Sequence, residues 1–162
     1  MSKTGSKSAE KNPAIDRAQK PDPALKRLDK LVGTWDMKGR TLDSKVDNIT
    51  GRVMIEWLPG GHFLLQRGEI TLMGTTLQSL EIVGYDPATK VFPSTVYSSM
   101  DGTPHPYFWD VQGNVVTHWT EGSKYTGTFS EDGKVLSGGW RPDKGVESNG
   151  GNTYDATMIR VK

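Results

Sequence analysis

Cysteine is absent from this chain of 162 residues, and histidine is scarce. The absence of cysteine excludes disulfides, thiolate metal sites and a cysteine nucleophile, so the fold must depend on burial and hydrogen bonds. The three histidines, His62, His105 and His118, are far apart in the sequence and have no spacing typical of metal ligands. The sequence therefore predicts no metal site.

Long apolar runs are also missing. No segment approaches the roughly 20 apolar residues of a membrane-spanning helix. The N-terminus is polar and then charged, without the apolar segment of a signal peptide. These absences predict a soluble, cytoplasmic protein with no membrane contact.

The charge is unevenly distributed along the chain. Residues 1–30 carry eight Lys or Arg and four Asp or Glu, whereas residues 31–162 carry twelve and fifteen. We interpret residues 1–22 as a disordered basic tail and residues 23–162 as one domain. The domain lacks the dense basic stripe of a nucleic-acid surface, so nucleic acid is not an expected partner. Weak contact between the tail and a polyanion is the alternative role for these charges.

A short helix is predicted before the first strand. Asp22 is a suitable N-cap, Pro23 a suitable first helical residue and Gly33 a stop signal. Such a helix would close one end of the fold or lie against it. Its apolar stripe consists of Leu25, Leu28, Leu31 and Val32.

After Gly33 the sequence changes to short segments rich in Val, Ile, Thr and aromatic residues. Turn sequences such as Pro59-Gly60-Gly61 separate them, as tight hairpins require. Helical patterns are scarce here, so the sheet is expected to be antiparallel throughout. Composition leaves open whether the strands form a sandwich or a closed barrel. The ten segments are about residues 34–41, 48–58, 62–73, 75–85, 91–100, 106–111, 114–120, 124–130, 135–141 and 153–161.

The order of several short motifs resembles a known family. A short helix, Gly33-Thr34-Trp35, a hairpin at residues 58–64, Val83-Gly84-Tyr85-Asp86-Pro87 and a final strand ending near Arg160 are similar to the small bacterial lipocalin-like proteins of the DUF1579 group, in the calycin superfamily. The resemblance implies an all-β fold, a single antiparallel up-and-down β-barrel of about ten strands with a short N-terminal helix. It also implies that Trp35 lies at the barrel floor under Arg160, as a structural pair.

A more distant resemblance is to the nitrobindins, ten-stranded barrels that bind haem. Their G-x-W-x-G-x-G start is partly matched by Gly33, Trp35 and Gly39. In that family the iron is bound by a histidine of the closing strand, whereas residues 154–161 contain none. Met158 is an imaginable axial ligand, but a strand methionine is usually a core residue. We therefore predict no cofactor and keep haem binding as an alternative.

Aromatic side chains on successive strands of the second half either line a cavity or fill the core. His118 lies in a strand whose alternation groups it with Val116 and Thr120, and either face of that strand can point inward. An inward His118 would be a candidate acid/base, because its unperturbed pKa is near neutrality. The residues predicted to bind a ligand are Tyr97, Tyr107, Trp109, His118 and Tyr125.

Acidic side chains give a weaker signal. Glu56 and Glu81 each lie between two apolar residues, which predicts that both point outward on alternating strands. Arg67 and Glu69 share one face of their strand, so the opposite face, with Gln66, is expected to point inward.

The leading functional hypothesis is that the barrel binds a small, mostly apolar or aromatic ligand in its interior, as a monomer or homodimer. The alternative is a small-molecule isomerase or cyclase in which His118 moves a proton. Whether the protein is an enzyme stays open at this stage. A third possibility is a barrel filled by its own side chains that serves interaction.

Overall fold

The described part of the chain, residues 19–162 of a computed structural model, begins with a short helix. Helix η1 (Pro23–Leu31) is a 3₁₀-helix, and the carboxylate of its N-cap Asp22 accepts a hydrogen bond from the amide of Ala24 at 2.8 Å. Three residues per turn place every third side chain on one face. That face is buried and consists of Leu25, Leu28 and Leu31. The predicted helix is confirmed, whereas residues 1–18 of the predicted tail lie outside the described residues.

Ten β-strands follow the helix, one within or close to each predicted segment. Turn glycines with positive φ separate several of them, for example Gly74 at 84° and Gly113 at 59°. The predicted number and order of strands are confirmed. The strands are β1 (Gly33–Thr41), β2 (Ile49–Trp57), β3 (Leu64–Leu72), β4 (Thr75–Val83), β5 (Phe92–Ser98), β6 (His105–Gln112), β7 (Val115–Thr120), β8 (Ser123–Phe129), β9 (Val135–Pro142) and β10 (Tyr154–Arg160).

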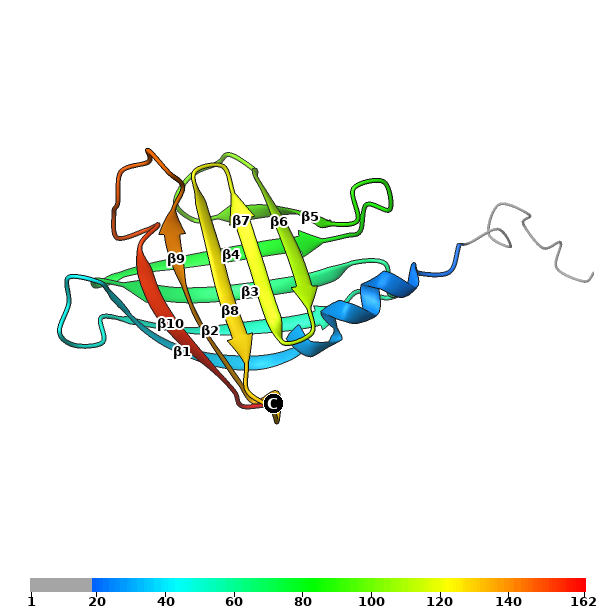
Figure 1. Ribbon diagram of the computed structural model, residues 1–162, viewed down its shortest axis with the longest axis horizontal. Helices are drawn as coiled ribbons and strands as arrows, with labels where there is room; N and C mark the ends of the chain where they lie inside the picture. The colour runs from blue at the N-terminus through cyan, green and yellow to red at the C-terminus, as the bar shows by residue number, and fades with distance from the viewer. Residues whose placement is uncertain (1–18) are drawn as a thin grey trace, which may run out of the picture.

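The strands form a closed antiparallel barrel (Figure 1). Each strand pairs with its neighbours in the sequence, and β1 also pairs with β10, with Trp35 opposite Arg160. Closure leaves no unpaired sheet edge. The choice between a sandwich and a barrel, which composition left open, is settled in favour of the barrel that the resemblance implied.

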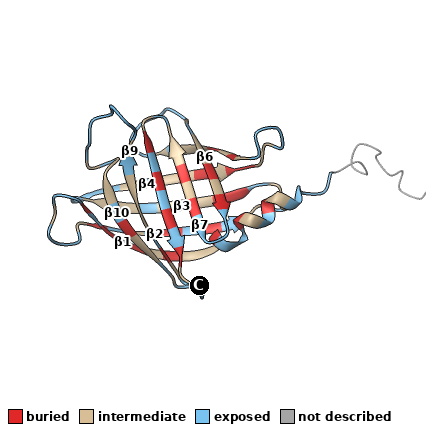
Figure 2. Cartoon of the chain, in the orientation of Figure 1, coloured by how far each residue is buried: buried red, intermediate tan, exposed pale blue. Residues whose placement is uncertain are grey.

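Alternation along the strands separates the two faces of the barrel wall (Figure 2). Strand β8 shows it most regularly, because Ser123, Tyr125, Gly127 and Phe129 are buried while the residues between them are exposed. Inward side chains and the leucines of η1 build the main core, which includes Trp35, and Met37, Ile49 and Ala156 build a second, smaller one. The inner face of the wall is thus where a site can be enclosed.

Helix η1 covers the end of the barrel at which β1 begins, here called the floor; the opposite end is called the mouth. Lys30 donates a hydrogen bond to the carbonyl of Gly113, in the β6–β7 turn, at 2.6 Å. The indole of Trp57, at the end of β2, donates to Asp29 at 2.9 Å. These bonds attach the helix to two sides of the floor.

Candidate functional site in the barrel interior

The barrel encloses a cavity of about 210 Å³. Leu31 and Trp35 line it toward the floor, and Trp140 and Tyr154 line it toward the mouth. Most of the wall is apolar or aromatic, and polar side chains meet near its middle. The cavity excludes the possibility that the barrel is filled entirely by its own side chains.

Glu81 of β4 is the central polar residue of the cavity and is 2% exposed. Its Oε1 accepts hydrogen bonds from Ser94 Oγ at 2.6 Å and from Trp109 Nε1 at 2.7 Å. His118 Nε2 lies 3.0 Å from the same oxygen, and Gln66 Nε2 donates to Oε2 at 3.2 Å. Four side chains from four different strands therefore converge on one buried carboxylate.

The prediction that Glu81 points outward is wrong, whereas Glu56 is exposed as predicted. The strand register gives the reason, because Glu81 pairs with the inward residues Gln66 on β3 and Val96 on β5. Burying a charge is unfavourable unless it is paired and hydrogen-bonded, and the four donors meet that condition. They come from distant parts of the sequence, so the flanking residues of Glu81 gave no sign of them.

The surroundings of Glu81 favour its ionised form. Burial by itself raises the pKa of this carboxyl. The positive charge of His118 and the hydrogen bonds that His118, Ser94 and Trp109 donate to the carboxylate outweigh burial and hold the pKa below its usual value. An ionised carboxylate only accepts hydrogen bonds. Nε2 of His118 is therefore the donor toward Glu81.

His118 of β7 is held from several sides. Its ring stacks on the indole of Trp109, with 3.7 Å between centroids and an angle of 16° between planes. The rings of Tyr107 and Trp140 lie 5.0 and 5.3 Å away. Within residues 19–162 the hydrogen bond of this ring is made by Nε2, toward Glu81. The sequence left open which face of this strand points inward, and His118, 8% exposed, lies on the inner one.

Three tyrosines add hydroxyl groups to the cavity wall. Tyr107, Tyr125 and Tyr154 line the cavity. Within residues 19–162 the Tyr125 hydroxyl is buried without a hydrogen-bond partner, and no side-chain hydrogen bond found there involves the hydroxyls of Tyr107 and Tyr154. Burial, and then the nearby Tyr107, raises the pKa of Tyr154 to about 12. Burial also raises the pKa of Tyr107 and of Tyr125. The three groups thus remain O–H at neutral pH.

The hydroxyl of Tyr125 occupies a space that two glycines provide. A side-chain carbon at Gly127 or Gly138, which pair with each other on β8 and β9, would lie within 3 Å of this hydroxyl. The hydroxyl oxygen is buried and unbonded. A buried hydroxyl without a partner is unfavourable by about 1–3 kcal/mol.

The predicted floor pair is present in the structure. The guanidinium carbon of Arg160 lies 4.2 Å from the centroid of the Trp35 indole. Arg160 also donates hydrogen bonds to the carbonyls of Val32 and Lys30, and the Trp35 indole donates to the carbonyl of Leu31 at 2.8 Å. The pair therefore joins the end of η1 to the closing strand, a structural role.

Four of the five residues predicted to bind a ligand line the cavity, namely Tyr107, Trp109, His118 and Tyr125. Tyr97 does not: it is 48% exposed and pairs with outward Leu80, while its neighbour Val96 points inward. The sequence prediction missed Glu81 and Tyr154. Alternation in its strand gave no clear signal for Glu81, because one face also holds Ser79 while the opposite face holds Leu80 and Ile82.

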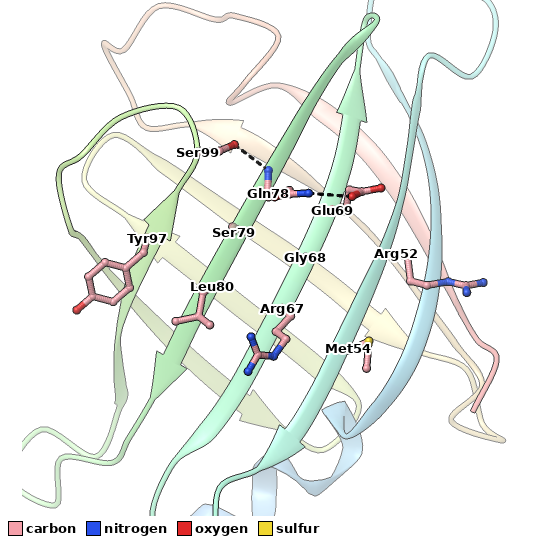
Figure 3. A pocket seen from close by; sticks show the side chains of 10 residues that line it. All are labelled: Arg52, Met54, Arg67, Gly68, Glu69, Gln78, Ser79, Leu80, Tyr97 and Ser99. Carbon is pink, nitrogen blue, oxygen red and sulfur yellow. Dashed lines mark hydrogen bonds between the residues drawn. The ribbon is translucent and has the colours of Figure 1, made fainter.

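A second hollow, here called the outer groove, lies on the outside of β2–β5 (Figure 3). Its volume is about 600 Å³. Figure 3 shows Arg67, Leu80 and Tyr97 on this face and the hydrogen bond from Gln78 to Glu69, 3.2 Å long. As predicted, Arg67 and Glu69 share the outer face of β3. The outer groove is larger than the cavity but open to solvent.

Residues 19–162 contain neither a cluster of metal ligands nor a membrane-spanning helix. No group of three or more His, Cys, Asp or Glu side chains in this part of the chain is arranged to hold a metal ion. No helix of the described residues is long and apolar enough to cross a membrane.

Residues 20–141 match the model of a family described as protein of unknown function, DUF1579. The match covers η1 and nine of the ten strands. The chain belongs to the DUF1579 family. Among curated proteins, no sequence matches it.

One solved structure has a fold similar to that of this DUF1579 barrel. It is titled "Crystal Structure of Rv2717c from M. tuberculosis", and it is 13% identical with a TM-score of 0.59. The match covers 88% of this chain and 99% of the other. At this identity the likeness concerns the fold alone, and it extends over nearly the whole barrel.

Proposed function

We propose that this DUF1579 protein binds one small, mostly apolar ligand inside its barrel. The observation that carries the proposal is the cavity in the barrel interior, whose aromatic walls surround a few convergent polar groups, as in ligand pockets generally. An apolar cavity of about 150 Å³ holds benzene, so a cavity of about 210 Å³ accommodates a ligand near the size of one substituted ring. Tyr107, Trp109, His118 and Tyr125 would contact it.

Binding can be tested with ethylbenzene as a probe. Three of the five tryptophans line the cavity, so their fluorescence is expected to change as the probe saturates the protein. The variant Ala156→Phe places a ring in the cavity and should abolish binding, because Ala156 lines it. Ile159→Phe is the matched control, on the exposed face of the same strand. Equal binding by both variants would contradict an interior site. Circular dichroism verifies that each variant is folded.

The natural ligand can be sought directly. Native mass spectrometry of freshly purified protein should reveal an added mass that disappears in Ala156→Phe and persists in Ile159→Phe. An added mass that persists in both variants would place that molecule outside the cavity.

A second candidate function, proton-transfer catalysis such as isomerisation or cyclisation, is favoured by the contact between Glu81 and His118. A carboxylate that accepts from one imidazole nitrogen fixes the tautomer and leaves the other nitrogen as a base. Here Nε2–H faces Glu81, so Nδ1 of the neutral ring would be the basic atom. It could remove a proton next to a carbonyl group, with the electron pair moving to the carbonyl oxygen.

Deuterium exchange separates catalysis from binding alone. Acetophenone in D₂O would exchange its methyl protons faster with the protein than without it if His118 acts as a base, as seen by NMR. His118→Gln should remove that acceleration and keep most of the affinity. No acceleration by the wild-type protein, despite saturation with acetophenone, would leave binding as the function.

Haem is a poor match to the donor set of the cavity. His118 is the only imidazole that lines it; its Nε2 is engaged by Glu81 and its ring face is covered by Trp109. The closing strand β10 contributes Met158, which packs in the core, and no histidine. A titration with haem should produce no Soret band typical of a ligated iron.

We also propose that the barrel is related to the calycin superfamily and works in the cytoplasm as a monomer or homodimer. The pairing of Trp35 with Arg160 at the floor supports the first point. The complete lack of cysteine fits a reducing compartment. Sedimentation equilibrium should give a mass of one or two chains. A larger assembly would contradict the proposed monomer or homodimer.

A further inference from the structure

The charges inside the cavity indicate which ligands it excludes. Among the described residues that line it, Glu81 and His118 are the charged groups, and no Lys or Arg is present. Arg160 lies nearby, but its guanidinium is bonded to backbone carbonyls across the face of Trp35. The interior therefore has a net charge of zero when His118 is protonated and of minus one when it is neutral. In either state a buried anion would find no unpaired cation.

A cationic ligand is also a poor match. Both oxygens of Glu81 already accept hydrogen bonds, three of them on Oε1. A ligand ammonium group would have to leave water and compete with these bonds for a carboxylate that the protein already satisfies. The cavity thus favours an uncharged ligand.

The hydrogen-bonding groups that remain are mostly donors. Tyr107 and Tyr154 line the cavity, and none of the side-chain hydrogen bonds found within residues 19–162 involves their hydroxyls. Burial raises the pKa of both groups, which keeps the hydroxyl proton in place. Glu81, the strongest acceptor, is already occupied, and Nδ1 of a neutral His118 is the other acceptor. A ligand oxygen that accepts hydrogen bonds would complete this arrangement.

We infer that the cavity selects an uncharged compound of about one ring that carries a carbonyl oxygen, with Tyr107 and Tyr154 as the donors to that oxygen. This inference rests on the proposed function and adds the chemical class of the ligand. The hydroxyl of Tyr125 lies against Gly127 and Gly138 and is a less accessible third donor.

Four probes with one ring each test the inference: ethylbenzene, acetophenone, benzoate and benzylamine. Dissociation constants come from tryptophan fluorescence at pH 7. Acetophenone should bind, and benzoate and benzylamine should bind more weakly by on the order of a hundredfold, because each must bury an unpaired charge. Benzoate or benzylamine binding as tightly as acetophenone would overturn the inference.

A double variant tests the two donors without changing the shape of the cavity. Tyr107→Phe combined with Tyr154→Phe should weaken acetophenone binding by about tenfold and leave ethylbenzene binding unchanged. Tyr97→Phe, in the outer groove, is the matched control and should affect neither probe. If the ratio of the two affinities is the same in the double variant and the wild-type protein, the tyrosines are not the donors and the inference fails.

The four probes distinguish a wrong ligand class from a wrong proposed function. Binding of ethylbenzene but not of acetophenone would refute the carbonyl class while the barrel remains a binding protein. Binding of none of the four probes by the folded protein would refute both.

Discussion

The cavity and the outer groove lie on opposite faces of the same two strands, β3 and β4. Gln66 and Glu81 point into the cavity, and Glu69 and Gln78 point into the outer groove. Each face thus has a carboxylate bonded to a glutamine amide at 3.2 Å. Only Glu81 has three further donors, because only its charge is removed from water. The outer groove is the larger hollow, yet the protein has organised polar groups around the smaller one.

This difference shows what burial demands. Water satisfies Glu69, so its neighbours can vary without large consequences. Glu81 must be satisfied by protein, and Ser94, Trp109 and His118 are committed to that task. Such a group is a stronger indication of a functional site than volume alone.

The largest expected difference between the two faces concerns aromatic residues. Trp35→Ala should lower the free energy of unfolding by about 3–5 kcal/mol, because it removes a 1% exposed side chain from the core. Tyr97→Ala in the outer groove should cost less than about 1 kcal/mol. Urea denaturation at pH 7 measures both values. Similar losses would mean that the outer groove is as tightly packed as the interior.

Removing the two carboxylates is expected to give the next largest difference. Glu81→Ala should destabilise by about 3 kcal/mol, since it leaves His118 and other buried donors without their acceptor. Glu69→Ala should change stability by no more than about 0.5 kcal/mol. The same urea experiment tests the pair. An unchanged free energy of unfolding in Glu81→Ala would show that the hydrogen bonds to Glu81 do not stabilise the protein.

The pH dependence of stability should sharpen the comparison further. The pKa of Glu81 in the folded protein is below its usual value of 4.5. The ionised carboxylate therefore contributes to the free energy of unfolding above about pH 4.5, and this contribution is lost as the pH falls through the folded pKa. Thermal melting from pH 6 to pH 3 should therefore show a smaller acid loss in Glu81→Gln than in the wild-type protein. Glu69→Gln is the control and should follow the wild-type curve.

The smallest effect concerns one hydroxyl group. Tyr125→Phe should stabilise the ligand-free protein by about 1 kcal/mol, because it removes a buried hydroxyl that has no partner. Tyr97→Phe should stay within about 0.5 kcal/mol of the wild-type value. A destabilised Tyr125→Phe would indicate that this hydroxyl has a partner, such as a bound water or ligand.

Much of the fold followed from local patterns. Asp22 and Pro23 marked the start of η1, and turn sequences with glycine separated several of the strands. These signals act over a few residues, so they can be read directly from the chain. Closure into a barrel came from the resemblance, because alternation and turns are the same in a sandwich.

The site was only partly predictable. Alternation grouped His118 with Val116 but left both faces possible, and it led to a wrong expectation for Glu81. Tyr97 was expected in the cavity because aromatic residues recur on successive strands, but it lies outside the barrel. A buried carboxylate and an exposed one look alike when only their neighbours in the sequence are known. Glu81 is separated from its donors Ser94, Trp109 and His118 by 13, 28 and 37 residues.

The sequence by itself determined the class of the fold, the number of strands and the lack of thiol chemistry, because each depends on composition or short-range pattern. The tertiary structure alone decided which face of each strand became the inside, and therefore which charge was buried. Pairing between strands sets that choice, and pairing joins residues that are far apart in the chain. The contact between Glu81 and His118, on which the proposed proton transfer depends, exists only once the barrel has formed.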